Sequence, residues 1–184
     1  AMTYKTDGAF ADVDALREQY GADVVILYRP YQNDGGCGVA WVGGYGANGD
    51  FSAPYWKDYA YSHIASDTCA DYVTVHELGH NMGLMHSRLQ DGSGGTLPHA
   101  LGHGEHGHFT TIMAYQSAFS VDYWQGKIYK FSSPALDCKG MPCGVDRSDA
   151  VNGADAVHAL GVAVPQIADY YATKVDDPTD NTDN

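Results

Sequence analysis

The chain has 184 residues, 44% hydrophobic and 18% charged, which is the composition of one globular domain with a core. Its formal net charge of −13 argues against nucleic acid or an anionic membrane as a partner, because both require clustered lysine and arginine. No apolar run approaches the about 20 residues that cross a bilayer. The acidic surplus either serves solubility or supplies oxygen ligands for calcium.

The first half of the chain predicts one helix and three strands. Residues 12–20 carry apolar side chains at helical spacing, and Gly21 ends this helix. Residues 23–28 contain a continuous apolar run, typical of a buried strand. Residues 39–42 and 59–65 are the other two strand candidates.

A longer helix is expected to begin at Ser66 or Asp67, either of which can cap it, and to run to about Gly83. The stretch 92–107 is rich in glycine and histidine and is predicted to be a loop.

A last helix is expected to begin near Ser148 or Asp149, with a kink or break at Pro165. The acidic, polar segment 176–184 is predicted to be a disordered tail or linker. Residues 1–175 are therefore assigned to one domain.

The four cysteines favour two disulfide bonds and a secreted, extracellular protein, because disulfides persist in oxidising compartments. Cys138 and Cys143 enclose only four residues, which favours a local pair and leaves Cys37 to bond with Cys69. A structural zinc site made of all four thiolates is the alternative. It is disfavoured because Cys37 and Cys69 lack the close paired spacing of such sites.

The segment 76–86 carries the strongest chemical signal. His76 and His80 are four residues apart, so on a helix they lie one turn apart on the same face and can share a metal ion. Glu77 follows the first histidine, where it can act on water at the metal. Gly83 can end the helix in a left-handed conformation, so that His86 turns back as a third ligand.

Three protein ligands leave one coordination position open, which is the arrangement of a catalytic zinc site. The alternative is that these are ordinary surface or core histidines. Two histidines and a glutamate at this spacing arise by chance often enough to be modest support. The added Gly83 and His86 make a chance match rare.

This eleven-residue string resembles the signature of the metzincin zinc peptidases. Members of that family also have a methionine turn beneath the metal, and residues 111–115 resemble it, with Met113 as the floor. The segments 37–43 and 131–134 resemble the reprolysin (adamalysin) branch. The resemblance implies an α+β fold: a small mixed twisted sheet, an active-site helix, and a loop-rich lower part with the methionine turn and a C-terminal helix.

The sequence departs from the reprolysin pattern at two places. Ser87 follows the third histidine where reprolysins usually have aspartate. Tyr115 lies two residues after Met113, where astacins and serralysins have a tyrosine that binds zinc or steadies the transition state. In addition, the strand, long helix and strand that family members usually place before the part resembling residues 12–28 are not found.

The resemblance implies a secreted, zinc-dependent endopeptidase that acts as a monomer on proteins or peptides. One zinc ion is held by His76, His80 and His86, and Glu77 is the general base. Tyr115 is either a donor to the oxyanion or a core tyrosine. The substrate is expected to lie extended along an edge strand formed by Val39, Ala40, Trp41 and Val42.

Two other functions are weighed against this one: an inactive zinc-holding binding or adhesion domain, and a metalloenzyme that hydrolyses something other than peptides. Inactive relatives usually lose the glutamate or a ligand, and here all four residues are present. The remaining histidines of the loop (His99, His103, His106 and His108) form either a solvated segment or a second metal site.

Overall fold

The structure is a computed structural model that describes residues 2–32 and 36–174. The tail predicted for residues 176–184 lies outside the described residues. No helix within the described part of the chain combines the length and apolar character needed to cross a membrane.

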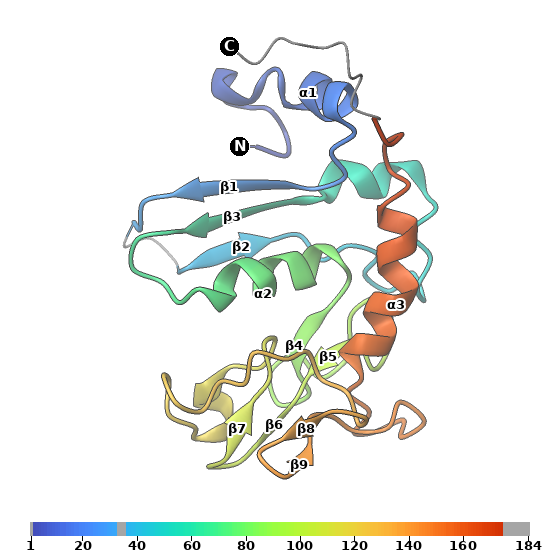
Figure 1. Ribbon diagram of the computed structural model, residues 1–184. Coiled ribbons are helices and arrows are strands. Elements are labelled where there is room, and N and C mark those ends of the chain that lie inside the picture. Colours follow the sequence, from blue (N-terminus) through green and yellow to red (C-terminus); the bar gives the residue numbers. More distant parts are fainter. Residues whose placement is uncertain (1, 33–35, 175–184) are drawn as a thin grey trace.

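A three-stranded mixed sheet forms the upper part of the molecule (Figure 1). The central strand β3 (Tyr61–Ala65) pairs in parallel with β1 (Val25–Arg29) and antiparallel with β2 (Gly38–Ala40). The predicted third strand is thus the centre of the sheet. Strand β2 lies at the edge, as expected, but it is shorter than predicted: Trp41 and Val42 follow it rather than belong to it.

Trp41 leaves the strand because its side chain is held by other contacts. Its indole Nε1 donates to Thr3 Oγ1 at 2.7 Å. Its ring makes edge contacts with the rings of Tyr4 and Tyr59. The pairing with β3 therefore ends at Ala40.

The N-terminal segment packs above the sheet through a buried arginine. The short 3-10 helix η1 (Gly8–Phe10) precedes α1 (Val13–Tyr20), which ends at the left-handed Gly21 as predicted. Arg17 is 2% exposed and donates to the carbonyl oxygens of Ala22, Asp23 and Lys57. The apolar Leu16 and Tyr20 are exposed, so α1 is anchored by a satisfied charge and not by an apolar face.

Helix α2 (Tyr72–Asn81) lies against the sheet and carries the first two histidines of the motif. It begins later than the predicted Ser66 or Asp67. Cys69 is bonded to Cys37 beside β2, so the preceding segment is committed to that link and the helix starts after Asp71. At its other end, Asn81 Nδ2 donates to the carbonyl oxygens of Trp41 and Tyr61, which joins the helix to the sheet.

The lower part is irregular, as expected, and is built from three small strand pairs (Figure 1). Their members are β4 (Met85–Ser87) with β5 (Leu101–Gly102), β6 (Gly104–Glu105) with β7 (Phe109–Thr110), and β8 (Asp137–Cys138) with β9 (Met141–Pro142). Two further 3-10 helices, η2 (Pro54–Tyr59) and η3 (Gln116–Phe119), complete the connections. The predicted loop 92–107 thus contains β5 and β6.

Helix α3 (Ala156–Ile167) runs beside both parts and links them (Figure 1). It starts seven or eight residues after the predicted Ser148 or Asp149. The side chain of Asp149 accepts from the backbone of Val151 and Asn152 and makes a turn, whereas Asp155 caps the helix. Pro165 lies inside the helix, which ends two residues later at Ile167.

A buried cluster fixes the lower part beneath α2. It joins residues from the segment after the helix, the predicted methionine turn and α3: Leu84, Ala100, Ile112, Met113, Ala156 and Ala159. The α+β architecture predicted from the sequence is therefore confirmed.

Both disulfide bonds of the structure join the expected pairs, and they predict unequal losses of stability. Removing Cys37–Cys69, with a sequence separation of 32, should cost about 3–4 kcal/mol, because a long loop loses more unfolded-state restriction. Removing Cys138–Cys143, with a separation of 5, should cost about 2 kcal/mol. Urea unfolding of the two double Cys→Ser variants tests this, and an equal or reversed order would contradict it.

Candidate metal centre

Three histidines from two elements converge beneath the sheet. His76 and His80 come from α2 and His86 from β4, and each offers a ring nitrogen within 4.8 Å of the others. The rings of His76 and His80 lie edge to face with centroids 4.8 Å apart. Across residues 2–32 and 36–174, this is the one group of three or more histidine, cysteine or acidic side chains close enough to hold a metal ion.

Backbone carbonyls orient the first two imidazoles. His76 Nδ1 lies 3.0 Å from Ile112 O, and His80 Nδ1 lies 2.8 Å from Leu84 O. A carbonyl oxygen only accepts, so each Nδ1 carries the proton and each Nε2 presents a lone pair. This is the usual support for metal-binding histidines.

An aspartate that the sequence analysis missed orients the third imidazole. Asp91 Oδ2 accepts from the backbone N–H of His86 at 2.7 Å and lies 2.9 Å from His86 Nδ1. Its sequence signal was weak, because an aspartate in a polar turn usually faces solvent. The carboxylate holds both the backbone and the ring of His86 in place.

Gly83 reverses the chain between the second and third histidines, as predicted. Its φ of +86° is left-handed, and an added Cβ would lie 2.7 Å from Thr96 Cβ. The next residue, Leu84, donates its N–H to Gly79 O at 2.9 Å, which closes the end of the helix. Both conformation and space therefore require glycine at this position.

The three imidazoles are neutral at neutral pH. Burial first, and the neighbouring imidazoles second, lower the pKa of His76 to about 3 and that of His80 to about 4. Burial also lowers the pKa of His86, although Asp91 opposes this. A metal ion requires the neutral ring, so this donor set fits a divalent ion of the zinc type.

Glu77 lies one residue from His76 and shares a pocket with it. Its side chain is 5% exposed, and burial raises the pKa of its carboxyl to about 7. A carboxylate with a pKa near neutrality exchanges protons readily at physiological pH. Glu77 is thus suited to proton transfer.

Met113 lies beneath α2, with none of its surface exposed. A Cβ on Gly79 would lie 2.6 Å from Met113 Sδ, so the glycine lets the methionine approach the helix closely. The structure therefore places this methionine directly under the turn between the two helical histidines, where the sequence predicts it.

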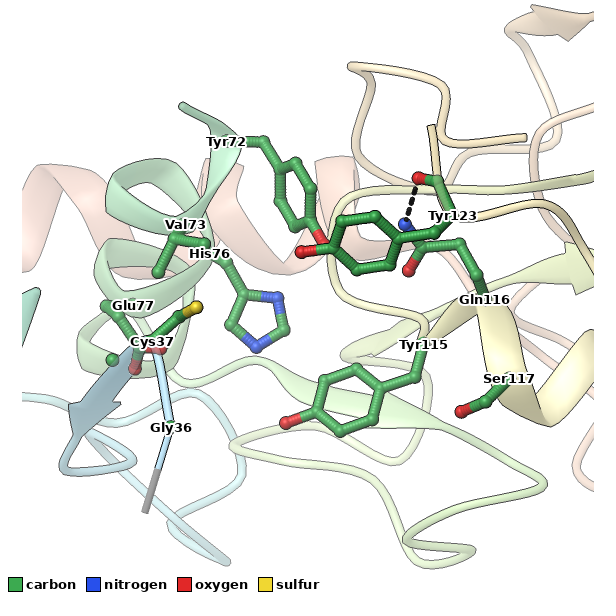
Figure 2. Close-up of a pocket in the computed structure, with 11 residues that line it drawn as sticks. Gly36, Cys37, Tyr72, Val73, His76, Glu77, Tyr115, Gln116, Ser117 and Tyr123 are labelled. Atoms are coloured by element: carbon green, nitrogen blue, oxygen red, sulfur yellow. Dashed lines mark hydrogen bonds between the residues drawn. The ribbon is translucent and has the colours of Figure 1, made fainter. Parts of the chain in front are cut away.

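Tyr115 lies beside the histidines of the metal centre and not in the hydrophobic core. It is 47% exposed, and its ring centroid lies 5.8 Å from that of His76 and 4.5 Å from that of His86. Figure 2 shows its hydroxyl pointing toward the side of the pocket where Glu77 lies. Burial raises the pKa of the phenol, so it stays protonated and can donate.

The pocket beside His76 has a volume of about 310 Å³ (Figure 2). One wall comes from the segment before and at the start of β2, and another from the first turns of α2. The third follows the methionine turn and includes Tyr115, Gln116, Ser117 and Tyr123. Both His76 and Glu77 line this pocket.

The other histidines do not form a comparable centre among the described residues. His99 Nε2 lies 2.9 Å from His158 Nδ1, and His103 lies 3.4 Å from the carboxylate of Glu105. The ring of His106 packs near that of Phe119. These pairs provide no third ligand, and the described residues likewise give the calcium prediction no support.

A family model described as Metallo-peptidase family M12 (Reprolysin_5) matches residues 3–125. This chain belongs to that family. The match includes the three histidines, Glu77, Met113 and Tyr115, and it agrees with the reprolysin-like resemblance.

The chain is also similar to two individual proteins. The chain is 38% identical over 180 residues to a Peptidyl-Asp metalloendopeptidase of Pseudomonas aeruginosa, which covers 89% of this chain and 28% of that protein. A chain in a solved structure titled "Structure of a chaperone-substrate complex" matches with a TM-score of 0.61 and 23% identity, over 87% of this chain and 22% of that one. The chain thus spans about a quarter of these relatives, and the second likeness concerns the fold alone.

Gly83→Ala should destabilise the protein by about 2 kcal/mol or more, because alanine is strained at a left-handed position and its methyl group meets Thr96. Gly161→Ala is the control: it lies in α3 with nothing within 4 Å of an added Cβ, so it should be neutral or stabilising. Thermal unfolding of both variants tests the pair. A Gly83→Ala protein as stable as the Gly161→Ala protein would contradict the stated role of Gly83.

Proposed function

We propose that the chain is the catalytic part of a zinc-dependent endopeptidase. The observation that carries this proposal is the set of three neutral imidazoles, two of them anchored through Nδ1 to carbonyl oxygens, beside a buried glutamate with a pKa of about 7. Membership of a metallo-peptidase family supports it.

His76, His80 and His86 would hold the zinc ion through the ring nitrogens that face one another. When bound, zinc polarises a carbonyl oxygen and lowers the pKa of a water ligand to about 7. The three rings come from a helix and a strand that are locked together by the turn at Gly83, so the site is set before any metal arrives.

Glu77 is the general base. Its carboxylate takes a proton from the attacking water and passes it to the nitrogen of the leaving amine. Burial keeps bulk water from competing for this proton and holds the pKa of Glu77 near 7, so one group both accepts and donates.

Tyr115 stabilises the oxyanion that forms when the peptide carbonyl is attacked. Its ring lies against His76 and His86, and its pKa is raised above the ordinary value by burial first and by Glu77 second. The protonated hydroxyl donates to the developing negative charge.

The substrate lies extended along β2. Among the residues that the structure describes, this strand pairs on one side only, with β3, and so lies at the edge of the sheet. Its other side offers main-chain groups to a peptide, and it begins at the rim of the pocket, where Gly38 lies close to the Glu77 side chain. Residues Gly38–Ala40 form this surface, with Trp41 and Val42 extending it beyond the strand.

The preferred substrate has an aspartate beside the scissile bond. This follows from the name of the relative that is 38% identical, a Peptidyl-Asp metalloendopeptidase. The two disulfides support an extracellular site of action for the enzyme, which works as a monomer.

Glu77→Gln should lower kcat about 100-fold to 10,000-fold while zinc stays bound, because the amide cannot accept the proton. Chelation should abolish peptide hydrolysis by the wild type, and added zinc should restore it. A quenched fluorescent peptide measures activity, and elemental analysis measures zinc. Wild-type turnover by a zinc-loaded Glu77→Gln protein would rule out the assigned base.

Asp91→Asn should weaken zinc binding about 10-fold to 100-fold, because the amide no longer offers a charged acceptor to both the N–H and the ring of His86. Asp58→Asn is the matched control, since Asp58 is exposed on η2. Competition with a fluorescent zinc chelator gives both affinities. Equal affinities in the two variants would mean that Asp91 does not support the third ligand.

A further inference from the structure

We propose that Lys127 makes the pocket beside His76 selective for a carboxylate side chain, by supplying the positive charge behind the pocket wall. This inference rests on the proposed peptidase function and identifies a residue that determines which substrate side chain the pocket prefers. It comes from the surroundings of Lys127, which the sequence analysis did not single out.

Lys127 is buried beneath the methionine turn. The residue is 8% exposed. The ammonium group donates to three carbonyl oxygens of that turn: Thr111 at 3.0 Å, Ile112 at 3.3 Å and Ala114 at 2.5 Å. These bonds fix the position of the charge against the methionine turn.

The charge of Lys127 has no counter-ion within residues 2–32 and 36–174, although the chain carries 23 acidic residues. Carbonyl dipoles satisfy the hydrogen bonds but do not neutralise the charge. A buried cation without an anion is unfavourable, and the burial lowers the pKa of Lys127 to about 7. An anion delivered by the substrate would relieve this cost.

The ammonium lies directly behind the wall of the pocket. Lys127 Nζ is 4.7 Å from the centroid of the Tyr72 ring, and Tyr72 lines the pocket together with His76 (Figure 2). Ala114, which accepts from Lys127, immediately precedes Tyr115 on another wall. A side chain that enters the pocket is therefore exposed to this charge through a low-dielectric wall, where electrostatic attraction is stronger than in water.

The same wall offers donors that a carboxylate can use. Figure 2 shows the hydroxyls of Tyr72 and Tyr123 next to one another in the pocket. Burial above all raises the pKa of Tyr72 to about 12, so its hydroxyl is protonated and able to donate. Gln116 Nε2 holds Tyr123 by donating to its backbone oxygen at 2.9 Å. Hydrogen bonds fix the side chain, and the charge selects its ionised form.

A carboxylate side chain and its amide analogue separate the contribution of the hydrogen bonds from that of the Lys127 charge. Aspartate and asparagine have the same shape and both accept hydrogen bonds from the tyrosines. Only aspartate carries a negative charge that can pair with the ammonium group of Lys127. The preference for aspartate over asparagine therefore reports on the ammonium specifically.

The first test compares two peptides that differ only in Asp or Asn at the cleaved position, using the zinc-loaded protein. The wild type should show a larger kcat/KM for the Asp peptide. In Lys127→Met the ratio of the two kcat/KM values should fall by about 30-fold or more, the loss expected when one partner of a buried charge pair is removed. Lys130→Met is the matched control, because Lys130 is exposed and lines no part of the pocket.

The ratio distinguishes selection from simple support of the methionine turn. If Lys127 only braces the turn, Lys127→Met will slow both peptides equally and leave the ratio unchanged, which would overturn the proposal. Lys127→Gln addresses a failure of the methionine variant to fold. Its amide can still donate to the carbonyls but carries no charge, so this variant should also show a lower ratio of kcat/KM for the Asp peptide to kcat/KM for the Asn peptide.

A binding measurement separates this inference from the proposed function. The zinc-loaded Glu77→Gln protein should bind the uncleaved Asp peptide about 10-fold or more tightly than the Asn peptide, by fluorescence anisotropy. If no peptide is cleaved by the wild type, the proposed function fails while this preference can still be measured. Equal affinity for the two peptides would overturn the role of Lys127.

Discussion

The centre depends on the hydrogen bonds between imidazole Nδ1 atoms and backbone carbonyls. His76 bonds to Ile112 O and His80 to Leu84 O, and both acceptors belong to the buried cluster that holds the lower part beneath α2. The orientation of the rings is therefore a property of the core and not of the metal. Ile112 O also accepts from Lys127 Nζ, so the first histidine and the buried lysine are positioned by the same carbonyl.

Local patterns were enough to predict the arrangement of the centre. Spacing along one helix and a glycine that must be left-handed brought His76, His80 and His86 together, and the structure has them in that place. The fold class was predicted from the family resemblance, and the family match confirms it. The start of α2 was missed because Cys69 is bonded to Cys37, far along the chain. The start of α3 was missed because the side chain of Asp149 forms a local turn instead of capping the helix.

Long-range polar partners were beyond the reach of the sequence. Lys127 looks like an ordinary surface residue in a polar chain, because nothing in its neighbours along the sequence marks it as buried. Arg17 is a similar case: its partners include Lys57 O, which is 40 residues away. For Lys127 and Arg17, the fold brings backbone carbonyl oxygens to a buried charge. The sequence around each residue does not indicate these contacts. Asp91 is partly exposed and bonds to His86 only five residues away, but a single aspartate in a polar turn carries no distinctive pattern.

The Cys37–Cys69 bond has a consequence for the rim of the pocket beside His76. Cys37 lines the pocket just ahead of β2, and Cys69 lies just ahead of α2, so this bond encloses the edge strand and the central strand in one covalent ring. Reduction would open this ring and leave β2 tied to its neighbours by hydrogen bonds alone, to β3 within the sheet and through Trp41 O to Asn81 of α2. The three histidines lie outside the ring, so reduction would loosen the rim of the pocket and leave the metal centre in place.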